Sequence, residues 1–429
     1  MSKVTLPYGK TSLSTEIPDR NLMLVGWPKE PSMIPLIDDE IQGALDNPIG
    51  GPRIADIAGP GKRIVIISDD YTRPTPTRSI LPALLARLSQ AGVAKSDVTI
   101  LVAGGIHRKM SEEDLIAKLG KEVVEQFRIV LHDVDDKEKM VCLGRTSRGT
   151  PVWIDKEVVQ ADVKISIGTV EAHPYAGFCG GAKIYAVASA GRESIYYNHG
   201  QLAASPDSWF GRTEGNPCWE DMVEFARMVK PDLGINVVLS AKKEVVRAFA
   251  GDIVACQKAA IEVFLQVYGV PLKRPADIVL ASANPKQFYF DLANLAMMNA
   301  GTIVKKGGTR VIAAYCEEAL GPALHRRLYT ESFGRPWPRS AEYLKEMQGG
   351  KYAYQMADAP AIYKLFQAEE KSEMILVTEA LPEEDANRMR LNWTRSLDEA
   401  MRQAFAKQGA DAQVAVLPLA GMCYPYLAN

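Results

Sequence analysis

The chain has 429 residues, enough for two or three domains, and its 47% hydrophobic and 24% charged residues are typical of a soluble globular protein. A formal net charge of −2 without a polybasic segment excludes a basic surface for nucleic acid or anionic lipid. The sequence shows no signal-like leader and no apolar run of ~18–20 residues, so we expect no membrane partner. Its cysteines form no CxxC pair, so we expect a cytoplasmic protein with no disulfide framework and no cysteine zinc site.

Short β-branched runs alternate with helical segments from the N-terminus onward. A hairpin turning at Tyr8-Gly9-Lys10 opens the chain. The strands expected after it are 62–70, 97–105, 127–134, 162–170 and 235–240; the helices are 79–91, one from Ser111, 216–229 and 251–269; a second hairpin covers 142–155. Strand–helix–strand order with apolar strands predicts a mainly parallel sheet covered on both faces.

A segment rich in proline and cations, 270–277, interrupts this pattern and predicts a domain boundary. Beyond it we expect the strands 277–284, 309–316, 373–380 and 413–421, and helices near 287–300, 340–348, 357–369 and 396–408. The predicted fold class is therefore α/β, with two α/β domains over 1–270 and 271–395. Residues 396–429 form a closing helix and strand that could return to the N-terminal domain.

Polar clusters follow three of the expected strands. They are Asp69-Asp70-Tyr71-Thr72-Arg73, Gly105-Ile106-His107-Arg108 and Glu171-Ala172-His173. Ligands of open parallel sheets bind beyond the carboxyl ends of the strands. We therefore expect the three clusters to converge on one edge of the first sheet.

The first cluster continues into a loop that two prolines stiffen, DDYTRPTP at 69–76. Thr72 and Thr75 can donate hydrogen bonds, and Arg73 can hold a carboxylate in a two-pronged contact. A rigid turn with an Asp–Arg ion pair explains the same residues equally well.

The segment Gly177-Phe178-Cys179-Gly180-Gly181-Ala182-Lys183 predicts a tight turn before a helix. Adjacent glycines let backbone N–H groups approach an anion closely, and Lys183 can neutralise a phosphate or act as a nucleophile. For so short a motif, a turn with a solvated lysine is the commoner interpretation, and the Walker pattern is absent.

Four of the five histidines lie on or near the predicted elements. His173 ends a buried strand, and His199 lies on a helix beginning near Gly191. One imidazole is too few ligands for a closed metal site, so a metal at His199 would need a cofactor to complete its coordination. His107 stands beside two cations that should lower its pKa and favour a neutral base, whereas His132 is expected to be a satisfied core histidine.

Together these residues resemble the nickel-dependent lactate racemase family over most of the chain. The resemblance rests on DDYTRPTP at 69–76, GGIHR at 104–108, HPYAGFCGGAK at 173–183 and the NH pair at 198–199. It implies a nickel-pincer nucleotide, a pyridinium-thioamide-thiocarboxylate mononucleotide, covalently attached at Lys183. It also implies that the nickel (Ni) is held by one carbon and two sulfurs of this cofactor and by His199.

The resemblance further implies a racemase or epimerase in which His107 and His173 are the catalytic bases. One removes the hydroxyl proton of a small-molecule 2-hydroxy acid as its C2 hydride moves to the cofactor, and the other reprotonates the oxygen after the hydride returns. Arg73 matches a family arginine near the substrate and Asp70 an aspartate near the cofactor. Thr72, Gly180 and Gly181 are candidate phosphate contacts.

The same resemblance places cofactor and catalytic histidines in the N-terminal domain, substrate contacts in the C-terminal domain and the active site in the cleft between them. Cofactor-synthesis proteins would be transient partners, and a homo-oligomer is compatible with the sequence. Family members acting on lactate carry a Gln and a Lys where this chain has Leu292 and Leu295, and a tryptophan where it has Tyr352. We therefore expect a substrate other than lactate, such as a sugar acid epimerised at C2. The candidate contacts for its polar tail are Lys286, Gln287, Tyr289 and Asn294.

Three alternatives stay open at this stage. The chain could bind or store the nickel nucleotide without catalysis, which needs only Lys183 and His199. It could be another hydride-transfer isomerase with the same cofactor. It could also be a nucleotide-binding module without metal.

Overall fold

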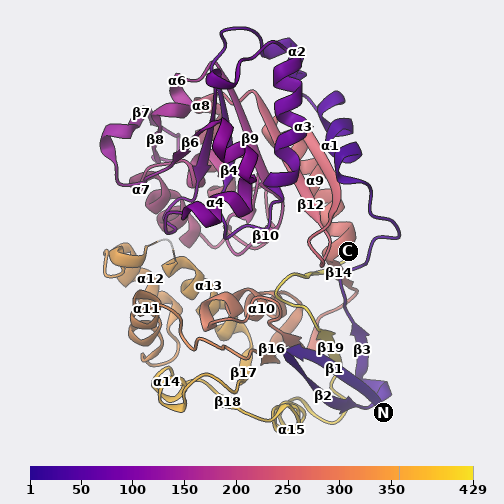
Figure 1. Cartoon of the computed structure of the whole chain (residues 1–429). Coiled ribbons are helices and arrows are strands. Elements are labelled where there is room, and N and C mark those ends of the chain that lie inside the picture. Colours follow the sequence, from indigo (N-terminus) through magenta and orange to yellow (C-terminus); the bar gives the residue numbers. More distant parts are fainter. Residues whose placement is uncertain (357, 429) are drawn as a thin grey trace. The chain divides into compact units, whose positions relative to one another are not determined.

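The computed structural model describes residues 1–356 and 358–428, and the chain divides into two compact units (Figure 1). One unit is Glu30–Val267, and the other combines Met1–Lys29 with Tyr268–Asn429. In the sequence, the first unit ends at Val267, a few residues before the segment 270–277.

The two ends of the chain depart from the predicted domains 1–270, 271–395 and 396–429. The first 29 residues join the C-terminal unit because β3 (Leu22–Val25) pairs in parallel with β19 (Val414–Leu417). The segment from 396 onward stays in that unit because α15 (Leu397–Gln408) packs on its sheet and β19 pairs with β15 (Ala276–Ser282). Figure 1 shows the indigo hairpin β1–β2 beside the C-terminal elements of the same unit.

The sheet of the unit Glu30–Val267 has the strand order β13-β12-β9-β4-β5-β6. Neighbouring strands are parallel, apart from the antiparallel pair β12–β13. The strands are β4 (Ile64–Asp69), β5 (Val98–Ala103), β6 (Arg128–Leu131), β9 (Val163–Thr169), β12 (Leu233–Leu239) and β13 (Val245–Gly251). Every residue of β4 and β12 is buried, as near-continuous apolar strands of a sheet covered on both faces require.

Helices and a hairpin surround this sheet, at positions close to those predicted. The helices are α1 (Ile37–Asp46), α2 (Ile54–Ile57), α3 (Thr77–Gln90), α4 (Glu112–Leu119), α5 (Lys121–Gln126), α6 (Lys156–Gln160), α7 (Arg192–Tyr196), α8 (Pro217–Val229) and α9 (Ile253–Tyr268); the hairpin is β7 (Met140–Arg145) with β8 (Pro151–Asp155). The predicted capping box is confirmed at the start of α4, where the Ser111 hydroxyl accepts from the Asp114 N–H. Asn216 caps α8 as expected.

The order of the strands reverses between β4 and β9. From β4 the chain adds β5 and β6 on one side, and it then adds β9, β12 and β13 on the other. Connections leave these two central strands in opposite directions, which opens a crevice beyond their carboxyl ends. The three polar clusters predicted from the sequence therefore follow three adjacent strands, β9, β4 and β5.

The other unit has a parallel sheet of order β18-β17-β16-β15-β19-β3. Its further strands are β16 (Val304–Ala313), β17 (Glu373–Val377) and β18 (Trp393–Thr394), with the pair β14 (Gly269–Leu272) and β20 (Tyr424–Leu427). Its helices are α10 (Phe290–Ile303), α11 (Ala323–Phe333), α12 (Ser340–Gln348), α13 (Ala359–Lys371), α14 (Glu383–Arg388) and α15. The hairpin of β1 (Ser2–Tyr8) and β2 (Thr11–Ile17) is confirmed and contributes Val4, Leu6, Tyr8 and Ile17 to this unit's core.

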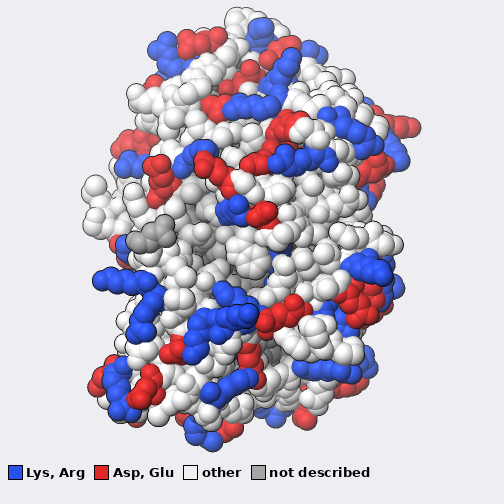
Figure 2. All heavy atoms as spheres, turned by 180° about the vertical axis from the view of Figure 1, so that it is seen from behind, with Lys and Arg blue, Asp and Glu red and all other residues white. Residues whose placement is uncertain are grey.

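The surface carries charges of both signs. On the face drawn in Figure 2, Lys and Arg side chains are interspersed with Asp and Glu side chains, as a net charge of −2 leads one to expect. Within the ranges 1–356 and 358–428, no helix combines the length and the apolar character that crossing a bilayer requires.

The placement of the N-terminus can be tested by truncation. Deleting Met1–Val25 should speed amide hydrogen exchange in Val414–Leu417, because β19 loses its edge neighbour β3 and the core loses the β1–β2 hairpin. Exchange in Val98–Ala103, in the other unit, is the internal control and should not change. If exchange became faster in Val98–Ala103 and did not change in Val414–Leu417, the assignment of the N-terminal segment to the C-terminal unit would be wrong.

Candidate active site

Two hydrogen bonds join the loops at the carboxyl edge of the first sheet. The Thr75 hydroxyl, after β4, lies 2.7 Å from the Thr169 hydroxyl at the end of β9. His107, after β5, places Nδ1 2.8 Å from Oδ2 of Asp70 at the end of β4. The expected convergence of the polar clusters is confirmed.

Asp70 is the partner of His107. Its side chain is only 4% exposed, and its other oxygen accepts from the Thr72 N–H (3.1 Å) and hydroxyl (2.5 Å). Burial acts to raise the pKa of Asp70, but the hydrogen bond and charge of His107, then Thr72 and Arg73, hold it below its usual value. Because a carboxylate only accepts, the neutral form of the His107 ring carries its proton on Nδ1 and keeps the lone pair on Nε2. Asp70 and Thr72, predicted as cofactor contacts, therefore position His107.

The two cations beside His107 have partners of their own. Arg108 pairs with Asp114 at 2.7 Å and lies over the Tyr71 ring, and Lys109 pairs with Asp133 at 2.6 Å. The structure thus gives His107 an acidic partner, and the cationic neighbours expected from the sequence are engaged elsewhere.

A buried ion pair anchors the loop after β4. Lys118 of α4 lies 2.6 Å from Asp69, and both side chains are 7% exposed. Its ammonium also donates to the carbonyl oxygens of Arg73 (3.0 Å) and Thr75 (3.1 Å), while the Thr75 hydroxyl donates to Asp69. Burial raises the pKa of Asp69, and Lys118 and Thr75 counteract part of that effect. Sequence reasoning missed Lys118 because its position within a helix gives no sign of the carbonyl groups that it reaches.

His173 lies in a two-residue strand, β10 (Ala172–His173), paired with β11 (Gly177–Phe178). Its Nδ1 accepts from the Ala176 N–H at 3.2 Å, so the neutral ring carries its proton on Nε2. The ring centroid lies 5.5 Å from that of His199, and Tyr175 contacts both rings, at 4.7 and 5.1 Å. His173 and His199 are thus neighbours, and Tyr175 is a third member that the sequence did not single out.

The two glycines before Lys183 are required by close packing. Gly180 and Gly181 have φ of +74° and +51°, and a Cβ on them would lie 2.5 Å from the Asn236 side chain and 2.6 Å from that of Gln257. The Gly181 N–H donates to the Asn236 oxygen at 2.9 Å. The predicted phosphate contact through the Gly181 N–H is therefore replaced by an internal hydrogen bond, while that of Gly180 stays a prediction.

Lys183 is buried, with 8% of the residue exposed, so the solvated-lysine interpretation is wrong. It directly precedes a single π-type turn, Ile184–Ala188. Burial, with a smaller contribution from the charge of Arg73, lowers the pKa of Lys183 to about 8. Roughly a tenth of the amine is then unprotonated at pH 7, far more than in an ordinary lysine, and the unprotonated form is the nucleophile.

His199 lies on a second π-type turn, Tyr197–Gln201, directly after α7. Its Nδ1 is 2.8 Å from Oδ1 of Asn198, an acceptor, so Nδ1 carries the proton. Its Nε2 is buried and has no hydrogen-bond partner in the described structure. Burial, then the charges of Lys183 and Arg73, lower the pKa of His199 well below its usual value.

A neutral imidazole with a bare, buried nitrogen fits a metal ligand. Among residues 1–356 and 358–428, no group of three His, Cys, Asp or Glu side chains could hold a metal ion. A metal at His199 would therefore take its other ligands from a cofactor, and the donor set present here fits that requirement.

Arg73 lies at the same edge. Its Nη1 is 3.2 Å from the Thr72 hydroxyl, and its charge acts on Lys183, His199 and Asp70. It therefore shares the electrostatic environment of the candidate cofactor residues. His132, by contrast, is confirmed as a core histidine, bonded at Nδ1 to Asp155 (3.0 Å) and at Nε2 to the Ala190 carbonyl (3.1 Å).

Two predicted substrate contacts of the C-terminal unit serve packing instead. Gln287 is buried and its Oε1 accepts from the Tyr315 N–H at 3.1 Å. Tyr352 is fully buried, stacks on Tyr343 with centroids 4.8 Å apart, and bonds through its hydroxyl to Glu346 and Arg335. These roles replace the direct substrate contacts expected from the sequence.

The remaining candidates lie at the start of α10. Asn294 is buried and donates to the Tyr329 hydroxyl, but its Oδ1 has no hydrogen-bond partner in the described structure. Lys286 and Tyr289 are partly buried and stay predictions. Leu292 is partly exposed and Leu295 is buried, so the helix carries aliphatic groups at both positions.

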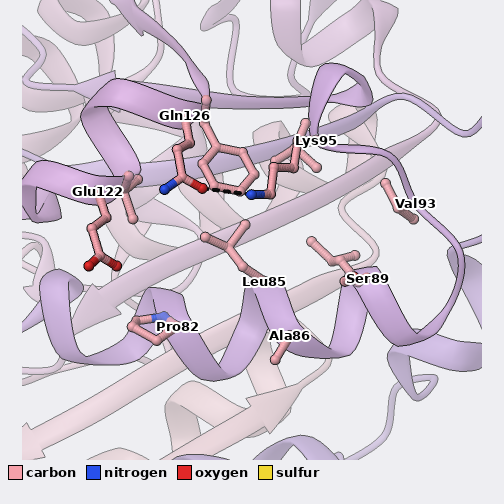
Figure 3. Close-up of a pocket in the computed structure, with 12 residues that line it drawn as sticks. Pro82, Leu85, Ala86, Ser89, Val93, Lys95, Glu122 and Gln126 are labelled. Carbon is pink, nitrogen blue, oxygen red and sulfur yellow. Dashed lines mark hydrogen bonds between the residues drawn. The ribbon is translucent and has the colours of Figure 1, made fainter.

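The pocket in Figure 3 belongs to the opposite edge of the first sheet. It has a volume of about 250 Å³ and lies between α3 and α5, with Val93 and Lys95 before β5 and Phe127 before β6. Lys95 is bonded to Gln126 at 2.6 Å (Figure 3). The site described above lies at the carboxyl ends of the strands, away from this pocket.

The anchoring ion pair can be tested through stability. Lys118→Met should lower the free energy of unfolding by about 3–5 kcal/mol, because it leaves the Asp69 carboxylate buried without its partner. Urea unfolding measures the change. The double variant Asp69→Asn/Lys118→Met removes the uncompensated charge and should be more stable than Lys118→Met; equal stability of the two would contradict this account.

The pKa of Lys183 predicts a pH dependence. Between pH 8 and 10.5 the unfolded chain binds more protons at this lysine than the folded chain, so the free energy of unfolding should rise with pH. Relative to Lys183→Met, cofactor-free wild-type protein should gain about 2 kcal/mol from pH 8 to 10 in urea unfolding. The exposed Lys137→Met is the matched control and should follow the wild type. A parallel course for wild type and Lys183→Met would refute the lowered pKa.

Comparison with known proteins shows the family of the chain. Residues 8–211 match the lactate racemase N-terminal domain, and residues 273–422 match the lactate racemase C-terminal domain. The chain is 30% identical over 423 residues to a lactate racemase of Lactiplantibacillus plantarum, covering 97% of this chain and 98% of that protein. It is 33% identical over 337 residues to a lactate racemase of Thermoanaerobacterium thermosaccharolyticum, covering 77% and 79%.

The fold is also that of a solved relative. The structure of the lactate racemase apoprotein from Thermoanaerobacterium thermosaccharolyticum superimposes with a TM-score of 0.87 at 28% identity, covering 99% of this chain and all of that one. The matched domains, the similarity over nearly the whole length and this shared fold lead to one conclusion: the chain belongs to the lactate racemase family and is an isomerase of the racemase kind.

Proposed function

We propose that the protein racemises or epimerises a 2-hydroxy acid at C2 with a nickel-pincer nucleotide attached at Lys183 and its nickel held by His199. The observation that carries the proposal is the buried, unpartnered Nε2 of His199, under the electrostatic influence of a buried Lys183 whose pKa is about 8. Lys183 and His199 would hold this cofactor, which would supply a reversible hydride acceptor for C2.

The protein's own contribution starts with Lys183 and Arg73. The unprotonated amine of Lys183 can form the covalent attachment, which the surrounding burial favours. Arg73 supplies a permanent cation that can hold the substrate carboxylate in a two-pronged contact. Family membership and the shared edge of the sheet support both roles. Loading of the cofactor would require transient contact with the proteins that synthesise it.

His107 and His173 handle the hydroxyl proton. The bare Nε2 of His107 accepts it as the hydride leaves C2, and the carboxylate of Asp70 stabilises the imidazolium that forms. The imidazolium then returns the proton to the oxygen. His173 presents Nε2–H, so it first donates a hydrogen bond; to act as a base it must release the Ala176 N–H and carry its proton on Nδ1. The two histidines are therefore not equivalent at rest.

The substrate proposed here is a 2-hydroxy acid other than lactate, such as a sugar acid epimerised at C2. Leu292 and Leu295 place aliphatic side chains on α10 in place of a carboxylate-binding lysine, and the unpartnered Oδ1 of Asn294 on the same helix can accept a hydroxyl hydrogen bond. A lactate methyl group would leave that oxygen unsatisfied, at a cost in free energy.

The storage alternative is less well supported. Storage needs only Lys183 and His199, whereas the pair of Asp70 with His107, whose side chain is partly exposed, supports a role for His107 in moving protons. The isomerase alternative is separable by label: deuterium at C2 stays at C2 in a racemase and appears at another carbon in an isomerase of different type.

Intact mass tests the cofactor. Protein co-expressed with the cofactor-making enzymes should carry an adduct of cofactor size that is absent from Lys183→Ala, with nickel detected by elemental analysis. His107→Ala should keep the adduct but lose about 10²–10⁴-fold in turnover, the usual contribution of general acid–base catalysis. Full turnover in both His107→Ala and His173→Ala would refute their roles as bases, whereas loaded wild-type protein that converts no 2-hydroxy acid would favour storage over catalysis.

A panel of 2-hydroxy acids tests the substrate. The loaded enzyme should convert hydroxylated, longer acids with a higher kcat/KM than lactate. The variant Asn294→Leu should narrow this difference, because it removes the acceptor without a large change in size. Lactate converted as fast as any other acid would refute the proposed substrate class while leaving the racemase assignment in place.

A further inference from the structure

A buried polar chain lies behind the nickel-ligand candidate. Asn198 is 1% exposed, and its Oδ1 accepts from His199 Nδ1 (2.8 Å) and from the Cys218 thiol (3.0 Å). Its Nδ2 donates to Oδ2 of Asp221 (2.7 Å) and to the carbonyl oxygen of Cys218 (3.0 Å). Each polar atom of the Asn198 amide therefore has a partner.

Asp221 ends this chain on α8 and is fully buried. Its Oδ1 accepts from the Thr146 hydroxyl (2.5 Å), and its Oδ2 accepts from the Thr150 hydroxyl (2.8 Å) as well as from Asn198. Both threonines lie between or next to the strands of the β7–β8 hairpin. A buried carboxylate that accepts several hydrogen bonds holds its donors firmly.

These contacts decide which way the Asn198 amide faces. Asp221 and the Cys218 carbonyl accept hydrogen bonds, so they require the NH₂ group, and the oxygen must then face His199. An oxygen at Nδ1 requires the Nδ1–H form of the ring, which leaves the lone pair on the unpartnered Nε2. Metal-binding histidines generally have the other ring N–H bonded to an oxygen in this way.

We propose that Asn198, oriented by Asp221, is a positioning residue that holds His199 in its Nδ1–H form and presents Nε2 as the metal donor. The proposal rests on the proposed function for the identity of the metal. The fixing of the ring itself concerns this chain alone and can be measured without cofactor.

The decisive readout is the protonation of the two ring nitrogens. In cofactor-free protein with ¹⁵N-labelled histidine, long-range ¹H–¹⁵N spectra should show His199 with a protonated Nδ1 and a bare Nε2. Its signals are assigned by their loss in His199→Gln. Asn198→Leu removes the acceptor and should convert this single form into a mixture of both. A persistent Nδ1–H form in Asn198→Leu would overturn the proposal.

Asp221→Asn keeps the shape of the buried chain and tests its direction. The new amide can donate to Asn198, so only the Cys218 carbonyl oxygen still requires the Asn198 NH₂ group, and the Nε2–H form of His199 should appear beside the Nδ1–H form. The exchanged pair Asn198→Asp/Asp221→Asn again presents an acceptor to Nδ1 and should restore the Nδ1–H form. A merely structural network would lose stability in these variants with the ring form unchanged, and that result would also overturn the proposal.

Asp155→Asn is the matched control, because it alters another buried histidine–carboxylate pair, with His132, in the same unit. It should leave the ring form of His199 unchanged. In protein loaded with cofactor, Asn198→Leu should keep the mass adduct at Lys183 but retain nickel about 10–100-fold more weakly than wild type on dialysis against a chelator. Wild-type protein with the expected ring form but with neither adduct nor nickel would overturn the proposed function and leave the role of Asn198 in orienting His199 intact.

Discussion

The reversal of strand order between β4 and β9 is the constraint on which the rest of the site depends. Because connections leave these strands in opposite directions, the space beyond their carboxyl ends is not covered by a crossover helix. The loops that follow β4, β5 and β9 turn toward each other there, and they bring Asp70, His107 and His173 to one edge. The buried Asp69–Lys118 pair then holds the first of these loops in place.

Burial gives the groups at this edge their chemical states. Lys183 and His199 are bases with little access to water, so burial shifts both toward the uncharged form, and Arg73, which stays charged, adds to the effect. An uncharged amine can bond covalently and an uncharged imidazole can bind metal, so the same physical effect prepares both groups. Arg73 and Asp70 carry charge at this edge. Arg73 can hold an anionic substrate, and Asp70 supports His107.

The strands and most helices could be predicted from the sequence because buried parallel strands are short, continuous apolar runs. The assignment of strand β3 to the sheet of the C-terminal unit could not be predicted. It depends on pairing with β19, which is almost 400 residues away in sequence, and no local sequence pattern indicates such a contact. In the site, His107, His173, Lys183 and His199 stood out by residue type and by their place after strands. Lys118 and Asp221 did not, and Asn198 stood out only as part of the NH pair, because the roles of all three depend on buried partners far away in sequence.

The substrate contacts expected in the C-terminal unit illustrate the same limit. Gln287 and Tyr352 have the right polar groups, but within the unit the Gln287 oxygen accepts from the Tyr315 N–H, and the Tyr352 hydroxyl bonds to Glu346 and Arg335. Residue type predicts what a side chain can bind, whereas burial and partners decide what it does bind.

The pairing of β3 with β19 has a consequence for biosynthesis. The unit Glu30–Val267 is continuous in sequence, so it can complete its fold on the ribosome as soon as it has emerged. The sheet of the other unit requires Leu22 of β3 to pair with Val414 of β19. In chain order, β3 is the first strand of this sheet and β19 is its last. The N-terminal hairpin must therefore wait, without its sheet, until almost the whole chain has been made, and this late closure of the longest loop makes the C-terminal unit the slow step of folding.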